Sequence, residues 1–273
     1  MAKKAYNESN IAAIADAIRR VGNPENSDNQ YTAAEMKSEI ESVAEYNFSE
    51  GKQQGWDSFS DSFQNYGNRK DYAHAFAQSA FTQEDIRKLK YKVTPAGTNH
   101  KCLFWRNDHI KKIEAANIDL SGVTLSQTSQ LSSNQQVFYD CAELTEIEDV
   151  GLPAGYYYYT FGMSEKLHTI AVVRSEETTL YTDAFVNNNS LRNITFEGVI
   201  GRNISFRQSP LLTIDSLKNI ISHLKDYTGT GNEHTYTLTL SSASKKALQN
   251  EGTTSPNGNT WAEYIDDLKW NLA

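Results

Sequence analysis

The chain of 273 residues has little of what builds disulfide frameworks, secretion signals and membrane spans. No stretch approaches the roughly 18 or more apolar residues that cross a bilayer, and the opening residues, MAKKAYNESN, lack the apolar core of a secretory signal. For the 2 cysteines, Cys102 and Cys141, we expect buried thiols in a reducing compartment, with a disulfide between them as the alternative. These features predict a protein made in the cytoplasm, without membrane insertion.

Positive charge is also scarce. The sequence has 26 Lys and Arg against 34 Asp and Glu, which gives a formal net charge of −8, and the acidic residues are spread along the chain. A surface that binds nucleic acid needs clustered positive charge to displace counterions from phosphates, so we expect no nucleic-acid partner. A hydrophobic content of 38% favours small cores joined by polar segments over one large globular core.

Motifs of catalysis and cofactor binding are missing as well. The 6 histidines are scattered, and the sequence contains no HExxH, C-x-x-C, P-loop, GxGxxG or G-x-S-x-G motif. The run TGTG at residues 228–231 is too short to cradle a phosphate and is more typical of a turn. We therefore expect a protein that is not an enzyme, with no catalytic residue, no metal and no cofactor.

What the sequence does contain is a short pattern repeated five times. The copies read FWRNDHIKKI, FYDCAELTEI, FGMSEKLHTI, FVNNNSLRNI and FRQSPLLTI. Their leading residues are Phe104, Phe138, Phe161, Phe185 and Phe206, so the last three steps are 23, 24 and 21 residues. Periods in the low twenties are typical of leucine-rich-repeat solenoids, whose units bury their apolar faces only by stacking on one another.

The segments L-x-x-I-x at residues 144–148, 167–171 and 191–195 are each predicted to form one short strand of a parallel sheet. The side chains expected to point inward are Leu144, Ile147, Leu167, Ile170, Leu191, Ile194 and Phe196. Those expected on the open sheet face are Glu146, Glu148, Thr169, Ala171, Asn193, Thr195 and Glu197. The phenylalanines would stack as a second apolar column behind the sheet.

Two copies depart from the pattern. The first step is longer, and we assign its extra residues to a loop in the polar run at residues 126–136. The last copy is one residue short, with Leu211 and Ile214 a position early. Terminal units of solenoids are often atypical, which accommodates this departure.

The repeats, residues 102–215, are flanked by three further predicted regions. Residues 1–48 are expected to form a paired-helix anchor, in which Ile11, Ile14 and Ile18 share one helical face. That face predicts packing on another copy of the chain or on a different protein, unless the helices simply cap the repeats. Residues 49–101 are an aromatic-rich connector, with a short helix from an N-cap at Thr82 through Leu89.

The C-terminal region, residues 216–273, is predicted to be an α/β cap. A helix presenting Leu217, Ile220, Ile221 and Leu224 is expected to end at Gly229. A half-buried strand at residues 235–241, a short helix at 241–250 and a closing helix at 260–273 follow. A solenoid must hide the apolar face of its final unit, and this region is suited to do so.

Two groups of residues are candidates for a binding surface. The first is the run of tyrosines Tyr156, Tyr157, Tyr158 and Tyr159, where alternation places Tyr156 and Tyr158 on one side and the other two on the opposite side. Exposed tyrosines stack on sugars and dominate protein hot spots, but packing between repeats or subunits is the alternative. The second is the open sheet face. Its Glu146 and Glu148 could bind a cation or act on a sugar, or could simply form a solvated face.

The order of these segments resembles a known group of proteins. The repeats are similar to BspA-like leucine-rich repeats, which place a Phe, a small or Cys residue, a Leu and an Ile as in FYDCAELTEI. The start, NIAAIADAIRRV followed by YTAAEMKSEIESV, resembles structural proteins of phages and prophages of gut bacteria. The segment GWDSFSDSFQNYGNRKDYAHAFAQSAFT and the ending TLTLSSASKKAL with a terminal Trp-containing helix resemble them too.

This resemblance implies an α/β fold: a short leucine-rich-repeat solenoid with parallel strands, an N-terminal helical segment and an α/β C-terminal cap. It implies a homo-oligomeric virion component of a tail fibre, tail tip or host-adsorption apparatus. The expected partners are other virion proteins, through Ile11, Ile14 and Ile18, and a glycan or protein receptor on the bacterial surface. The alternatives are a BspA-type bacterial cell-surface adhesin, and a head or baseplate decoration or adaptor protein without a receptor.

Overall fold

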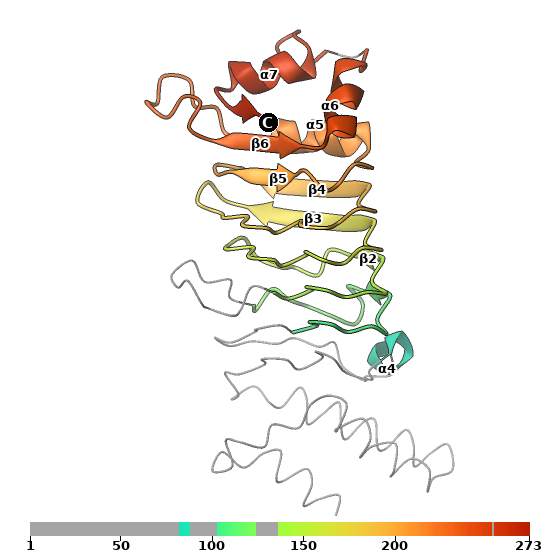
Figure 1. Ribbon diagram of the computed structural model, residues 1–273. Helices are drawn as coiled ribbons and strands as arrows, with labels where there is room; N and C mark the ends of the chain where they lie inside the picture. The colour runs from blue at the N-terminus through green and yellow to red at the C-terminus, as the bar shows by residue number, and fades with distance from the viewer. Residues whose placement is uncertain (1–81, 88–102, 124–135, 253) are drawn as a thin grey trace, which may run out of the picture.

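The computed structural model describes residues 82–87, 103–123, 136–252 and 254–273. Within these ranges the chain has α/β character, with parallel strands in two sheets and a few short helices (Figure 1). Several predictions fall outside the described residues: the helices that carry Ile11, Ile14 and Ile18, the connector before Thr82, the state of Cys102, and nearly all of the loop at residues 126–136.

The first sheet contains four parallel strands in the order of the chain. They are β1 (Lys112–Ile113), β2 (Glu146–Ile147), β3 (Thr169–Ser175) and β4 (Asn193–Gly198). Each repeated isoleucine pairs with the next, so Ile113, Ile147, Ile170 and Ile194 form one buried row. The predicted parallel strands are therefore confirmed. All seven side chains predicted to point inward are buried.

The leading phenylalanines form a continuous stack. Ring centroids are 5.5 Å apart for Phe104 and Phe138, and 6.0 Å for Phe138 and Phe161. They are 5.5 Å apart for Phe161 and Phe185, and 4.6 Å for Phe185 and Phe206. Phe196 of β4 meets the rings of Phe185 and Phe206 at 6.4 and 6.3 Å, so this column lies across the core from the sheet. The predicted second apolar column is present.

A buried ladder of polar side chains runs beside the phenylalanines. The residue three positions after each of them is buried: Asn107, Cys141, Ser164, Asn188 and Ser209. Three of these, which we name the donor ladder, each donate to the carbonyl of the leading phenylalanine one repeat earlier. Cys141 Sγ lies 3.0 Å from the Phe104 oxygen, Ser164 Oγ 2.8 Å from that of Phe138, and Asn188 Nδ2 2.8 Å from that of Phe161. Because buried carbonyls need partners, the ladder ties each repeat to the one before it.

The thiol of Cys141 is expected to resist alkylation while the chain is folded. Cys141 is free and buried, and burial raises the pKa of its thiol to about 12. At pH 8 only roughly one thiol in ten thousand would then be the reactive thiolate. We expect iodoacetamide to label Cys141 at least about 100-fold more slowly in the native protein than in denaturant. Peptide mapping by mass spectrometry separates it from Cys102, and equal native and denatured rates would contradict this burial.

The predicted helix follows the last repeat directly, and Leu211 is not the buried aliphatic residue of that repeat. Leu211 is 42% exposed, and α5 (Ile214–Ser222) begins after the N-cap Thr213. The helix covers the edge of β4: Ser216 Oγ accepts from the Ile194 N–H at 3.0 Å, and Asn219 Oδ1 accepts from the Phe196 N–H at 2.7 Å. Side chains of α5 therefore satisfy a strand edge that would otherwise be open to further pairing.

Helix α5 ends at Ser222, well before the predicted end at Gly229. The reason is a backbone pairing that the periodicity does not reveal. Ile200 donates to the His223 carbonyl at 2.7 Å and accepts from the Lys225 N–H at 2.9 Å, so the chain after α5 is held extended beside Ile200. The four apolar residues predicted for the inner face of this helix are nevertheless all buried.

A second parallel sheet and two helices close the C-terminal end. The sheet has the order β5 (Ile204–Phe206), β6 (Thr237–Leu240) and β7 (Asn271–Leu272), accompanied by α6 (Ser242–Gln249) and α7 (Trp261–Asp267). The predicted strand and short helix are confirmed as β6 and α6. The closing helix was predicted too long, because Asn271 and Ala273 donate to the Tyr236 and Leu238 carbonyls at 2.9 and 3.0 Å and extend the sheet instead.

Candidate binding surface

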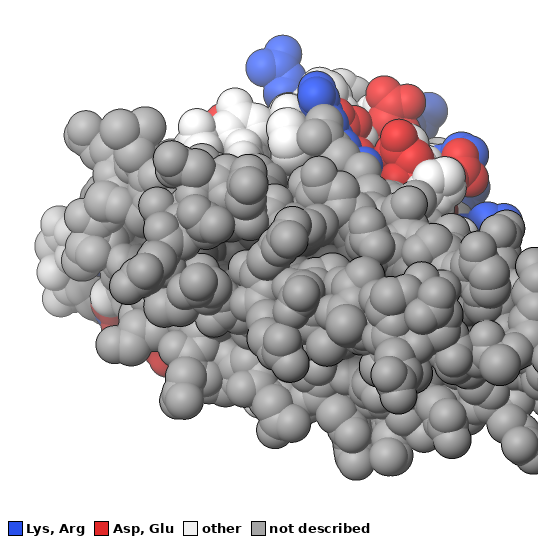
Figure 2. All heavy atoms as spheres, turned by 90° about the horizontal axis from the view of Figure 1, so that it is seen from below, with Lys and Arg blue, Asp and Glu red and all other residues white. Residues whose placement is uncertain are grey.

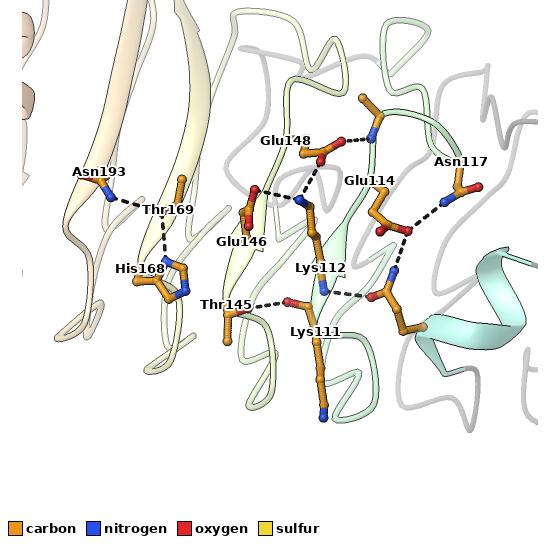
Figure 3. Close-up of polar contacts among 12 residues, drawn as sticks. Lys111, Lys112, Glu114, Asn117, Thr145, Glu146, Glu148, His168, Thr169 and Asn193 are labelled. Carbon is orange, nitrogen blue, oxygen red and sulfur yellow. Dashed lines mark hydrogen bonds and ion pairs between the residues drawn. The ribbon is translucent and has the colours of Figure 1, made fainter.

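The outward face of the first sheet aligns one side chain from each strand in a row. Lys112, Glu146, Thr169 and Asn193 are direct register partners on β1 to β4 (Figure 3). Neighbouring parallel strands lie about 4.8 Å apart, so these side chains form a compact polar row. The seven residues predicted for this face are all half-buried or exposed, as expected for outward positions.

Glu146 and Glu148 converge on one ammonium group. Lys112 Nζ lies 2.9 Å from Glu146 and 2.7 Å from Glu148, and Glu148 also accepts from the Ala115 N–H at 2.8 Å (Figure 3). The hydrogen bond from Lys112 is the main reason why the pKa of Glu148 lies below its ordinary range. In this geometry the two carboxylates already share a cation that belongs to the protein.

Replacing Lys112 with glutamine is expected to raise the pKa of Glu148 toward its ordinary value. The backbone bond from Ala115 would remain, so the return would be partial. A carboxylate with a depressed folded pKa stabilises the fold above its unfolded pKa, and this stabilisation is lost as pH falls through the folded pKa. The variant should therefore lose less stability on acidification than the parent. NMR titration of Glu148 checks this, with Lys111→Gln as the matched control; identical titrations in parent and Lys112→Gln would contradict it.

Helix α4 (Gln83–Arg87) closes the β1 edge of this face. Its N-cap Thr82 and its start agree with the prediction. Residues 88 and 89, to which the helix was predicted to extend, lie outside the described residues. Gln83 Oε1 accepts from the Lys112 N–H at 2.9 Å, and Arg87 and Gln83 donate to Glu114 at 2.5 and 3.0 Å. The hydrogen bond from Arg87 is the main cause of a lowered pKa at Glu114.

Arg174 organises the β3 and β4 side of the face. Its guanidinium donates to both carboxylate oxygens of Asp149, at 2.7 and 2.9 Å, and lies 3.5 Å from Glu197. This bidentate pair is the main reason why the pKa of Asp149 is lowered. Where charged side chains are visible at the upper edge of Figure 2, basic and acidic ones lie intermingled. The surface presents paired charges rather than a field of one sign.

The tyrosine run does not alternate as predicted. Tyr157 is fully buried, stacks between Phe161 and Tyr181 at 5.7 and 5.9 Å, and donates its hydroxyl to the Pro153 or Arg174 carbonyl, each at 2.8 Å. Tyr157 is therefore a core residue and not a binding residue. Tyr159 does not follow it inward, because its φ of 53° places its backbone in the left-handed region. Tyr156, Tyr158 and Tyr159 all stay partly exposed.

Sequence reasoning missed the cations of this surface. Lys112 occupies in FWRNDHIKKI the position that Glu146 occupies in FYDCAELTEI, so aligning the copies would have placed the two side by side. No such signal existed for Arg174, because a register shift between Ile170 and Val173 precedes its pairing with Glu197. Tyr139 was also missed; it follows Phe138 directly and joins the exposed tyrosines.

Among residues 82–87, 103–123, 136–252 and 254–273, no group of three or more His, Cys, Asp or Glu side chains is placed to hold a metal ion. None of the helices in these same ranges has the length and apolarity needed to cross a membrane. The fold and the surface together define an α/β protein with parallel sheets and a polar, ion-paired sheet face. No protein-family model, curated protein or solved structure matches the chain.

Proposed function

We propose that residues 102–215 form a short leucine-rich-repeat solenoid of the BspA-like type. The proposal is supported by the repeat period, by the isoleucine row along the sheet and by the stacked phenylalanines. A stack of this kind is stiff along its length, because each unit contacts only its neighbours and shares a continuous core with them. Stiffness suits a part whose work is to hold a surface in place.

We propose further that the chain is a non-enzymatic phage virion protein of the tail fibre, tail tip or host-adsorption apparatus. The observation that carries this proposal is the outward sheet face, where fixed polar rows lie on a regular scaffold and bonds within the face hold the side chains. Such a face suits recognition by shape and polar contact more than chemistry. The resemblance of the flanking segments to phage and prophage structural proteins supplies the virion context, and a homo-oligomer accords with the symmetry of fibres and tail tips.

Two measurements test this proposal. Mass spectrometry of purified particles should find the chain in the virion, and its detection on bacterial surfaces instead would favour the BspA-type adhesin. Purified full-length protein should bind intact gut bacteria that the phage infects. Presence in particles without binding to cells would leave the decoration or adaptor role in place of host adsorption. Density for the chain in an intact particle would show which end is attached to other virion proteins.

A further inference from the structure

Four partly exposed tyrosines meet on the surface behind the phenylalanine column. We name Tyr139, Tyr156, Tyr158 and Tyr159 the tyrosine cluster. Tyr159 meets Tyr158 at 4.6 Å and Tyr139 at 5.5 Å, with the rings perpendicular in both pairs, and Tyr156 lies 5.7 Å from Tyr158. The cluster joins rings from two consecutive repeats, since Tyr139 follows Phe138 and the other three precede Phe161.

The backbone and the rings of the cluster are held in place by the fold. The Tyr159 N–H donates to the Thr182 carbonyl at 3.1 Å, and the Tyr156 hydroxyl donates to Thr182 Oγ1 at 3.2 Å. Perpendicular aromatic contacts are themselves favourable, so each ring restricts the next. Burial is the main cause of the raised pKa values of Tyr139 and Tyr159, whose hydroxyls therefore remain neutral donors. A surface that is already ordered loses little conformational freedom on binding.

The rim of the cluster is polar and contains both donors and acceptors. Arg106 Nε lies 2.8 Å from Asp140, the neighbour of Tyr139, and the Arg106 guanidinium lies 4.9 Å from the centroid of the Trp105 ring. Asp183 interacts with the Tyr159 hydroxyl, and Thr182 adds a hydroxyl group. Sugar hydroxyls both donate and accept hydrogen bonds, so they can engage a carboxylate and a guanidinium at the same rim.

The size of the cluster favours a few sugar rings over a protein partner. A tyrosine buries about 150–250 Å² in full, and these four are already mostly buried, so together they offer on the order of 100–300 Å². A stable protein interface takes about 800 Å² from each partner and has an apolar centre. The large hydrophobic side chains that are exposed in the described ranges, Val199 and Leu211, belong to later repeats and not to this patch.

We propose that the tyrosine cluster binds a neutral carbohydrate chain, with sugar rings stacked on Tyr158 and its neighbours and hydroxyls bonded to the rim of Asp140, Arg106 and Asp183. This inference rests on the proposed function, because it names the receptor chemistry of a host-adsorption protein. It also moves the glycan-binding site away from the sheet face. The rim pairs Arg106 with Asp140 and adds the carboxylate of Asp183, so it holds one net negative charge, which disfavours an anionic polymer and is too little to select a polycation.

The test uses the full chain and hexasaccharides of glucose and of N-acetylglucosamine, titrated by calorimetry. At least one should bind saturably at millimolar concentration or below. Tyr158→Ala should weaken that binding at least about 10-fold, the loss expected for one stacking contact of about 1.4 kcal/mol. Tyr158→Phe, which keeps the ring, should stay within about 3-fold. Tyr264→Ala on α7 removes a partly exposed tyrosine outside the cluster and should leave the affinity for the hexasaccharide unchanged.

Three results would overturn the inference: no hexasaccharide binds, Tyr158→Ala binds as the parent does, or Tyr158→Ala abolishes self-association of a chain that binds no sugar. The last would make the cluster a protein interface. Adhesion to intact bacteria separates this inference from the proposed function. Adhesion that survives Tyr158→Ala contradicts the glycan site and leaves host adsorption standing. Sugar binding by a chain that neither adheres to bacteria nor occurs in particles would support the glycan site and contradict the proposed function.

Discussion

Replacing Phe161 with alanine is expected to lower the free energy of unfolding by about 3–5 kcal/mol. Phe161 is 1% exposed and is the central ring of the column, between Phe138 at 6.0 Å and Phe185 at 5.5 Å. Tyr157 packs against it at 5.7 Å, so alanine would leave a cavity that these three rings cannot close without moving backbone. Chemical denaturation followed by circular dichroism measures this loss.

The matched controls are Phe161→Leu and Val199→Ala. Leucine keeps most of the buried volume and should cost clearly less than alanine, about 1–2 kcal/mol. Val199 is 43% exposed, and its truncation should change stability by no more than about 0.5 kcal/mol. If Phe161→Ala also cost less than about 1 kcal/mol, the phenylalanines would not form a continuous core, and the stacked architecture would fail with them.

The sheet and the phenylalanine column could be predicted from the sequence because their cause is periodic. A parallel stack repeats the same environment in every unit, so the same residue types recur at the same offsets. The isoleucine row, the outward positions of Glu146 and Thr169, and the ring stack all follow from aligning the copies. The predicted strand β6 had the same basis, since alternation of Thr with Tyr and Leu has period two.

The features that could not be predicted depend on contacts made once. Helix α5 was predicted from its apolar spacing, but its docking on the edge of β4 through Ser216 and Asn219 was not, because no repeat of the sequence encodes that match. Tyr157 and Tyr159 part ways because a single left-handed residue breaks the alternation. The end of the chain adds β7 because the Tyr236 and Leu238 carbonyls lie within reach of it. Periodicity carries no information about such closures.

The two candidate surfaces differ in what holds their side chains. On the sheet face, Lys112 and Arg174 are engaged by carboxylates of the protein itself, and binding an ionic ligand there would first have to break those pairs. In the tyrosine cluster the rings fix one another by edge contacts. These rings are uncharged, so a ligand that stacks on them has no ion pair of theirs to break. The face therefore suits scaffolding and polar docking, whereas the cluster suits stacking of an uncharged ring.

Replacing Asn188 with alanine is the second change expected to be strongly destabilising, by about 2–4 kcal/mol. Asn188 is fully buried, and its Nδ2 donates to the Phe161 carbonyl at 2.8 Å and to the Ser164 carbonyl at 3.3 Å. The Ser164 carbonyl would keep the Leu167 N–H at 3.0 Å, but alanine offers the Phe161 carbonyl no donor in its place. The loss combines that buried, unsatisfied acceptor with a small cavity.

Two further variants separate the hydrogen bond from the cavity. Asn188→Ser places at this rung the residue that Ser164 supplies one repeat earlier, where its hydroxyl reaches the Phe138 carbonyl at 2.8 Å. It should therefore recover at least about 1 kcal/mol relative to alanine, although the two side chains differ by a single oxygen. Asn189→Ala removes the exposed neighbour and should be nearly neutral. Equal stabilities for Asn188→Ser and Asn188→Ala would mean that the donor ladder contributes by filling space alone. The buried Cys, Ser and Asn would then not be what ties each repeat to the one before it.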